Sequence, residues 1–166
     1  MEIRSEQLQD ECAISAIITA AFLGAKHSGG DEAEIVEVLR KSGNLTVSLV
    51  AVLDNTVVGH AAFSPVSIDG HYRGWFGLGP VAVSPDRQGK GIGAALIQNG
   101  LQRLRQQKSL GCVVLGDPHY YARFGFVADP NFSLAGVPPE YFQRLAFSGQ
   151  SNVGGRVQYH SAFGSS

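Results

Sequence analysis

Hydrophobic residues recur with helical spacing in three parts of the chain. Between residues 10 and 23, apolar side chains lie three and four positions apart, which places them on one face of a helix. A second helix is expected from Asp31, a capping residue, to Gly43, a residue that ends helices. The clearest pattern covers residues 90–107, where the buried stripe consists of Ile92, Leu96, Ile97, Leu101 and Leu104. The sequence therefore predicts three amphipathic helices.

Strand signals fill most of the remaining chain. Residues 46–53, 56–68 and 75–83 are rich in apolar and β-branched residues, and turns at Asp54-Asn55 and Asp69-Gly70 join them as hairpins. Further expected elements are a buried strand at 112–115, a short helix at 118–124, a strand at 126–128, a short helix beginning at 138–142 and a strand at 157–163. This order predicts an α/β (α+β) fold with a mixed, mostly antiparallel central sheet flanked by helices.

Composition indicates one globular domain spanning residues 1–166. Hydrophobic residues make up 44% of the chain and charged residues 16%, and the net charge is -1. Such a balance predicts no strong attraction to nucleic acid or to an anionic membrane. No apolar run reaches the roughly 18 residues that a membrane helix needs, and the N-terminus lacks a signal pattern, so we expect a cytoplasmic protein.

The two cysteines are far apart in the sequence. Cys12 and Cys112 lie in apolar surroundings, which favours buried free thiols in a reducing compartment. The two cysteines and five histidines show no metal-ligand spacing, so no metal site is expected.

A glycine-rich loop joins the third strand to the clearest helix. After the apolar run that ends at Val83, the sequence turns at Ser84-Pro85 and places glycines at every second position: Gly89, Gly91 and Gly93. Without Cβ atoms the backbone can approach a ligand closely, and the free N–H groups at a helix N-terminus favour an anion. The loop therefore predicts a pyrophosphate-binding site.

Two common nucleotide motifs do not explain this loop. The segment Gly89 to Ala94 matches the dinucleotide fingerprint formally, and Asp117 follows at about the right distance. However, the dinucleotide fold needs its first glycine directly after a strand, and here residues 84–88 intervene. The preceding strands are also expected to pair as hairpins, which that fold does not do. A triphosphate-binding loop needs Ser or Thr after Lys90, where the chain has Gly91.

The loop resembles the acyl-CoA loop of the GNAT superfamily of N-acetyltransferases. Gln88, Gly91 and Gly93 match its pattern of Gln or Arg, two residues, Gly, one residue, and Gly or Ala. A second similar block is residues 120–126, a short helix with a tyrosine four residues before Gly-Phe. Two further segments, Gly116-Asp117-Pro118 and residues 138–142, resemble those of a bacterial subgroup of predicted acetyltransferases. This subgroup has no single agreed substrate. The resemblance implies the acyl-CoA N-acyltransferase fold.

The resemblance also implies a role for each part of the loop. Acetyl-CoA would be the co-substrate, and a longer acyl-CoA is left open. The backbone of Val81, Ala82 and Val83 would bind the pantetheine arm as an added strand, which requires the strand at 112–115 to splay away. The amides that would hold the pyrophosphate belong to Gln88, Gly89, Lys90, Gly91, Ile92, Gly93 and Ala94. Lys90 or Arg87 could contact the 3′-phosphate or be merely solvated.

Tyr121 is the candidate catalytic residue. It occupies the family's position four residues before Gly125. A tyrosine hydroxyl has a pKa of about 10 and a thiol one of about 8.5, and these values are close enough for the hydroxyl to protonate a departing thiolate. Tyr120 would point about 100° away on a helix. The base that receives the amine proton is left open among Glu32, Glu34, Asp117 and His119.

Two functions remain open from the sequence. The first is an N-acetyltransferase that moves the acetyl group of acetyl-CoA to a primary amine by direct attack. The alternative is a non-catalytic acyl-CoA-binding regulatory module. The acceptor would be a small-molecule or peptide amine, contacted by Phe22, residues 26–30, residues 69–71 and residues 141–142. The strand at 157–163 could form a homodimer by adding to a partner's sheet.

Overall fold

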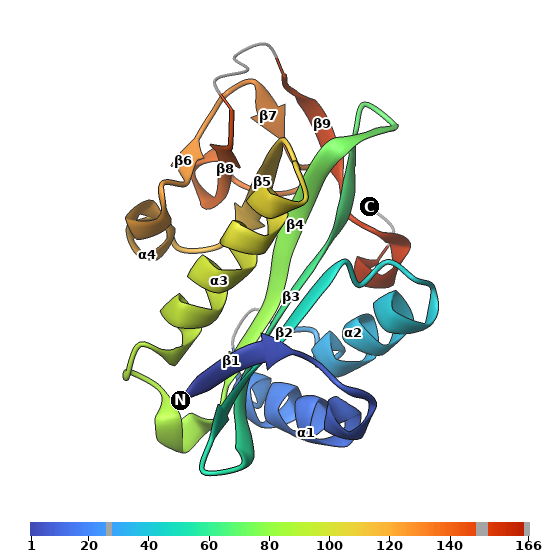
Figure 1. Cartoon of the computed structure of the whole chain (residues 1–166). Coiled ribbons are helices and arrows are strands. Elements are labelled where there is room, and N and C mark those ends of the chain that lie inside the picture. The colour runs from blue at the N-terminus through green and yellow to red at the C-terminus, as the bar shows by residue number, and fades with distance from the viewer. Residues whose placement is uncertain (26–27, 149–152, 165–166) are drawn as a thin grey trace.

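The computed structural model describes residues 1–25, 28–148 and 153–164, and it confirms the elements predicted for the first two thirds of the chain (Figure 1). The helices are α1 (Glu11–Phe22), α2 (Glu32–Lys41) and α3 (Ile92–Gln106), and the strands are β2 (Val47–Leu53), β3 (Thr56–Ile68) and β4 (His71–Val83). The turn at Asp54 and Asn55 has positive φ at both residues, as the tight turns of two-residue hairpins require.

The central sheet has the order β1-β2-β3-β4-β5-β8-β6. Its other members are β1 (Glu2–Ser5), β5 (Gly111–Leu115), β6 (Val127–Ala128) and β8 (Phe142–Ala146). All neighbours are antiparallel except β4 and β5. At the far end of β3, Ser67 and Ile68 pair with β9 (Gly155–Gln158), which also lies parallel to β7 (Phe132–Ser133). The predicted mixed, mostly antiparallel fold is confirmed.

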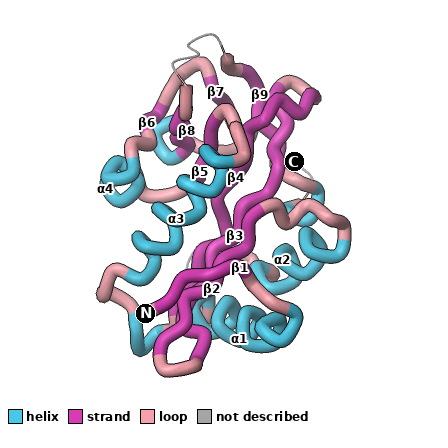
Figure 2. Tube along the Cα trace, in the orientation of Figure 1, coloured by secondary structure: helices cyan, strands magenta, loops and turns pink. Residues whose placement is uncertain are grey.

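Helices cover both faces of the sheet (Figure 2). The side chains of Leu49, Ala61 and Phe63 pack with the buried stripe of α3 on one face. The alternate residues Val50 and Ala62 pack with α1 and α2 on the other face, as the two-residue period of a strand requires. A third apolar cluster fills the distal half of the sheet and includes Trp75, Phe132 and Val157. The sheet thus has two covered halves that meet at β4 and β5.

The pairing between β4 and β5 is short. Only Trp75–Gly77 pair with Gly111–Val113, and no pairing joins the rest of β4 to β5. The register of β4 against β3 shifts between the pairs that Ala61 and Phe63 make, next to Gly79, which has φ +136. The two strands therefore separate after Gly77, which is the splaying that the sequence analysis expected, and the outer edge of β4 lies open from Leu78 to Val83.

Four predictions for the ends of the chain were incomplete or wrong. β1 and β7 were not predicted, because both are short and have mixed polarity. The helix expected from 138–142 is a single 3-10 turn at Pro139–Tyr141, followed at once by β8. The strand expected at 157–163 is β9, which ends at Gln158, and a 3-10 turn at Ser161–Phe163. Strand partners decide these segments: β1 pairs with β2, β7 with β9, β8 with β5 and β9 with β3, and local sequence does not encode these pairings.

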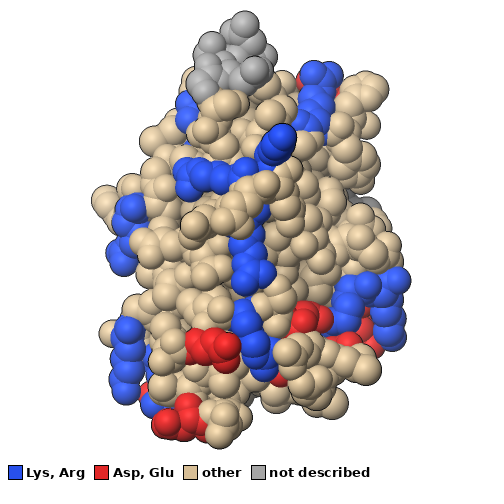
Figure 3. Space-filling view, viewed as in Figure 1, with Lys and Arg blue, Asp and Glu red and all other residues tan. Residues whose placement is uncertain are grey.

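The exposure of side chains corrects one further expectation. Cys112 is buried as predicted, but Cys12 is exposed because it lies on the outer face of α1. In the view of Figure 3, both signs of charge occur and neither covers the face. Among the described residues, no helix combines the length and the apolar character needed to cross a bilayer.

Candidate active site

The glycine loop forms a tight path from β4 to α3. Pro85–Arg87 make one 3-10 turn, and Gly89 and Gly91 then adopt φ +76 and +83, a region that favours glycine. The Gln88 side chain donates a hydrogen bond from Nε2 to the Val83 carbonyl oxygen at 3.0 Å. Gln88 therefore fixes the loop against the end of β4.

The first turn of α3 presents free N–H groups. Its backbone bonds begin with the N–H of Ala95, which donates to the Gly91 carbonyl oxygen at 3.1 Å. The N–H groups of Ile92, Gly93 and Ala94 precede this bond and have no partner within the helix. The first turn of α3 holds no acidic side chain that would compete for them. These three amides are the hydrogen-bond donors that the predicted pyrophosphate site requires.

A cavity of about 690 Å³ adjoins the open edge of β4. One wall is the β4 segment from Leu78 to Val81, and Leu115 of β5 and Tyr121 lie across the opening. The other lining residues come from α1, the α1–α2 connection, α2, the segment after β7 and the C-terminal segment: Phe22, Gly29, Asp31, Glu32, Ile35, Leu134, Ala135, Tyr159, Phe163 and Gly164. The cavity thus connects the gap between the splayed strands with the region expected to bind an acceptor.

Tyr121 lies on α4 (Pro118–Tyr121) and lines this cavity. Asp117 is the N-cap of α4, where its carboxylate accepts a hydrogen bond from the His119 backbone N–H at 2.9 Å. Burial raises the pKa of Tyr121 to about 12, with smaller contributions from nearby Tyr120, Cys112 and Asp117. The Tyr121 hydroxyl therefore stays protonated at neutral pH and can act as a proton donor.

Tyr120 faces a different part of the site. A Cβ atom on Gly93 would lie 3.5 Å from the Tyr120 hydroxyl oxygen, so this hydroxyl lies beside the first turn of α3. The Arg123 guanidinium stacks on its ring, 4.3 Å from the centroid. The Tyr120 ring also meets the Tyr121 ring edge to face, with centroids 5.0 Å apart, so the two tyrosines form one aromatic cluster beside the loop.

Of the four candidate bases, Glu32 is among the residues that line the cavity. Its carboxylate accepts a hydrogen bond from the Ser28 hydroxyl at 2.7 Å. Glu34 and His119 are exposed, and Asp117 serves as the cap of α4. The structure brings Glu32 and Tyr121 to one cavity and leaves the other three outside it.

The expected acceptor contacts are only partly present. Phe22 and Gly29 line the cavity, whereas residues 26–27 lie outside the described residues. The hairpin tip at 69–71 and residues 141–142 are not among the described lining residues. Sequence reasoning missed Tyr159 and Phe163, whose only signal was their place in an apolar C-terminal segment.

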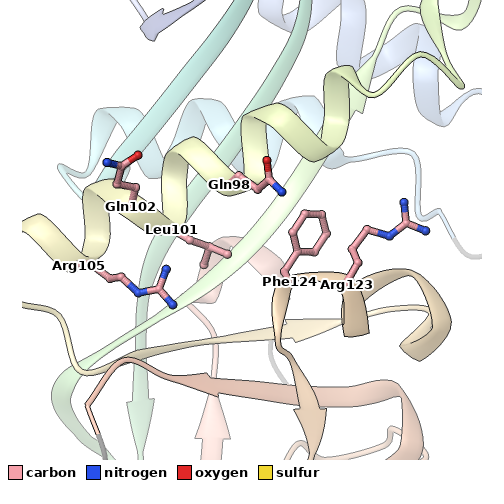
Figure 4. A pocket seen from close by; sticks show the side chains of 6 residues that line it. All are labelled: Gln98, Leu101, Gln102, Arg105, Arg123 and Phe124. Atoms are coloured by element: carbon pink, nitrogen blue, oxygen red, sulfur yellow. The ribbon is translucent and has the colours of Figure 1, made fainter.

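A second cavity, of about 320 Å³, lies between α3 and the 3-10 turn that follows α4 (Figure 4). Gln98, Leu101, Gln102 and Arg105 come from α3, and Arg123 and Phe124 come from the 3-10 turn after α4. It shares no lining residue with the first cavity. The α4 segment therefore contributes to two separate hollows.

A helix N-terminus with free N–H groups, an open strand edge and a partly buried tyrosine are the features expected of an acyltransferase. Comparison with known proteins gives the family. The model of the acetyltransferase (GNAT) domain matches residues 44–128. The uncharacterized N-acetyltransferase YhbS of Escherichia coli K12 is 37% identical over 169 residues, which cover 98% of each chain. This chain belongs to the GNAT acetyltransferase family.

Two solved structures resemble the whole chain. A GNAT family acetyltransferase from Brucella melitensis, in complex with acetyl-CoA, is 49% identical with a TM-score of 0.88, and the match covers 98% of this chain and 97% of that one. YhbS from Escherichia coli, in complex with CoA, is 34% identical in the structural comparison with a TM-score of 0.85, covering 98% and 91%. Both likenesses include the C-terminal segment that lies outside the matched domain.

Proposed function

We propose that this protein transfers the acetyl group of acetyl-CoA to a primary amine by direct attack, with Tyr121 as the general acid. The observation that carries the proposal is the continuous path from the α3 cradle along the open edge of β4 to the cavity lined by Tyr121. The complexes of the Brucella relative with acetyl-CoA and of YhbS with CoA support the choice of co-substrate.

The residues along this path fit such a ligand. The pyrophosphate would accept hydrogen bonds from amides between Gln88 and Ala94, where positive φ at Gly89 and Gly91 exposes the backbone. The amides of the pantetheine arm would pair with the backbone of Val81, Ala82 and Val83, which β5 leaves free. The arm then runs back along β4 toward Gly79, so the thioester would reach the point where the strands separate.

The chemistry needs a proton acceptor and a proton donor on opposite sides of the thioester. The amine nitrogen attacks the carbonyl carbon, and the carbonyl π electrons move to the oxygen. Collapse of this intermediate forms the amide and breaks the carbon–sulfur bond. Tyr121 would donate its proton to the departing thiolate, and Glu32 would receive the proton that the amine loses, directly or through water.

The variant Tyr121→Phe tests this assignment. It removes the hydroxyl and keeps the ring that packs on Phe126, with centroids 6.0 Å apart. We expect kcat to fall about ten-fold or more, because general acid catalysis contributes about 10²–10⁴-fold, while the Kd for acetyl-CoA stays the same. Release of free CoA over an amine panel measures kcat, and calorimetry measures the Kd.

The matched control is Tyr72→Phe, because Tyr72 is 70% exposed on the β3–β4 hairpin and should leave both constants unchanged. Full turnover by Tyr121→Phe would remove Tyr121 from the mechanism. Tight binding of acetyl-CoA by the wild type without CoA release on any small amine or peptide would support a non-catalytic acyl-CoA-binding module.

A further inference from the structure

Tyr159 reaches the cavity from outside the matched acetyltransferase segment. It directly follows β9, which is anchored where Val157 and Gln158 pair with β3. Its ring meets the Phe163 ring at 5.2 Å between centroids, in an edge-on arrangement. The Tyr159 side chain is therefore held by packing on both sides and is not free to leave the cavity wall.

The Tyr159 ring lies over the point where the sheet opens. A Cβ atom on Gly77 would be 2.5 Å from Tyr159 Cε2, and Val66 also lies beside the same position. Gly77 is the last residue of β4 that pairs with β5. Glycine at this position therefore leaves room for the ring, and the ring closes the narrow end of the gap between the two strands.

The Tyr159 hydroxyl is buried, and it has no hydrogen-bond partner among the described residues. Burial raises the pKa of Tyr159, and the nearby Cys112 and Tyr121 raise it further. The hydroxyl is therefore a neutral donor, and Tyr159 and Tyr121 line the same cavity. A buried hydroxyl without a partner carries a desolvation cost that phenylalanine would avoid while filling almost the same volume.

We infer that the Tyr159 hydroxyl donates a hydrogen bond to the thioester carbonyl oxygen of acetyl-CoA, as a second catalytic tyrosine. The inference rests on the proposed function, because that function places the thioester near Gly79 at the narrow end of the gap. It supplies the buried hydroxyl with the partner that the described part of the protein lacks.

The bond would act at the addition step. When the amine nitrogen adds to the carbonyl carbon, the carbonyl oxygen gains the electron pair and the negative charge. The Tyr159 O–H would hold this oxygen without giving up its proton. The charge returns to the carbonyl as the thiolate leaves and takes the proton of Tyr121. The Tyr159 hydroxyl thus acts at the carbonyl oxygen, and the Tyr121 hydroxyl acts at the sulfur.

A spectroscopic test follows the carbonyl directly. Acetyl-CoA labelled with ¹³C at the carbonyl is bound to the wild type and to Tyr159→Phe, and the isotope-shifted carbonyl stretch is measured by difference infrared spectroscopy. Loss of the hydrogen bond should move the band to higher frequency in the variant. Tyr72→Phe should keep the wild-type band. An identical band in Tyr159→Phe would overturn the inference.

A kinetic test separates catalysis from packing. Removing one donor to such an oxyanion typically lowers kcat by about 10²–10³-fold, so Tyr159→Phe should show a fall of this size with an unchanged Kd for CoA. A kcat within three-fold of the wild type would contradict the role. A wild type that turns over no amine would contradict the proposed function instead. In that case the infrared band would still show whether the Tyr159 hydroxyl bonds the thioester carbonyl oxygen.

Discussion

Two glycines mark the places where the candidate tyrosines pack. A Cβ atom on Gly116 would lie 2.5 Å from Tyr121 Cε2, and one on Gly77 would lie at the same distance from Tyr159 Cε2. Distances this short do not occur between real side chains, so each ring occupies the space of a missing one. The orientation of each tyrosine therefore depends on a residue that has no side chain.

Substitution of Gly116 should affect activity through Tyr121. The methyl group of Gly116→Ala must push the Tyr121 ring aside, and a displacement of about 1 Å can lower turnover about 10²-fold. Steady-state measurement of kcat checks this expectation. In a Tyr121→Phe background the same substitution should cost little further activity, because the hydroxyl it misplaces is already absent. Equal losses in both backgrounds would contradict the explanation.

The sequence identified one of these tyrosines and missed the other. Tyr121 has a local signal, because it lies four residues before a glycine that ends the turn with φ +98. Tyr159 has none, because its place follows from the pairing of β9 with β3, whose two residue pairs are 89 and 91 positions apart in the chain. A residue brought to a site only by distant strand pairing cannot be found from spacing.

At the scale of elements, a polar network joins the N-terminal strands to α2. The Glu6 carboxylate accepts hydrogen bonds from Arg40 Nε at 2.7 Å and from Ser48, which also bonds His60 at 2.8 Å. Burial alone would raise the pKa of Glu6, but the hydrogen bonds from Arg40 and Ser48 and the nearby His60 ring nitrogen, 3.8 Å away, outweigh burial and hold the pKa far below its usual range. The network thus stabilises the junction of β2, β3 and α2.

Removal of the Glu6 charge should destabilise the fold. We expect Glu6→Gln to lower the free energy of unfolding at pH 7 by about 2 kcal/mol, as measured by urea denaturation. Because the pKa is depressed in the folded state, this stabilisation is present above the unfolded pKa of about 4.3 and is lost as pH falls below it. The difference from the wild type should therefore shrink below about pH 4.

The matched control is Glu37→Gln. Glu37 forms an exposed pair with Lys41 at 2.7 Å on the same helix as Arg40. Such pairs contribute about 0.3–0.5 kcal/mol, so the control should change the free energy of unfolding very little. A loss as large for Glu37→Gln as for Glu6→Gln would show that burial of the network is not what gives Glu6 its effect.

Elements with strong periodicity were predictable, and those defined by their partners were not. The stripe of α3 and the hairpins of β2, β3 and β4 carry the signal within the segment itself. In β8, the preceding prolines indicate a helix start, but Phe142–Ala146 instead pair along the whole of β5. Backbone pairing at a free sheet edge outweighs a weak local preference.

At the scale of the whole molecule, the gap between β4 and β5 separates two halves of the sheet. The half formed by β1 to β4 carries α1 and α2, and the half formed by β5, β8 and β6 carries α4. They remain joined by three residue pairs, by α3 and by the third apolar cluster, which includes Trp75 of β4 and Val113 of β5. A ligand that lies in the gap would contact both halves and replace the missing strand pairing.

Acetyl-CoA should therefore raise the melting temperature. At a ligand concentration a hundred times the Kd, stabilisation is about 2.7 kcal/mol, which for a chain of this size corresponds to about 5–10 °C in a thermal melt. In Gly91→Val the rise should nearly vanish, because a side chain would occupy the cradle. Gly70→Val is the control, since Gly70 has a similar φ of +81 on a distant hairpin. An equal rise in Gly91→Val would contradict the placement of the pyrophosphate.

The fold class and the candidate cofactor loop were predictable because they are local and regular. The cavity was not, because its walls come from α1, α2, β4, α4 and the C-terminal segment, which meet only in three dimensions. The expected acceptor region at 141–142 illustrates the difference: it is next to the site along the chain, yet Tyr141 is 46% exposed and outside the described cavity lining.

Because Tyr159 lies late in the chain, the parts of the site form in sequence during synthesis and folding. The cradle, the open edge of β4 and Tyr121 are all made before residue 122 has been synthesised, whereas the wall formed by Tyr159 and Phe163 waits for β9 to dock beside β3 and for the last 3-10 turn to meet α2. Such long-range contacts form late, since they require a long loop to close. A growing chain could thus bind its co-substrate before Tyr159 and Phe163 complete the wall of the cavity where the acetyl group would be transferred.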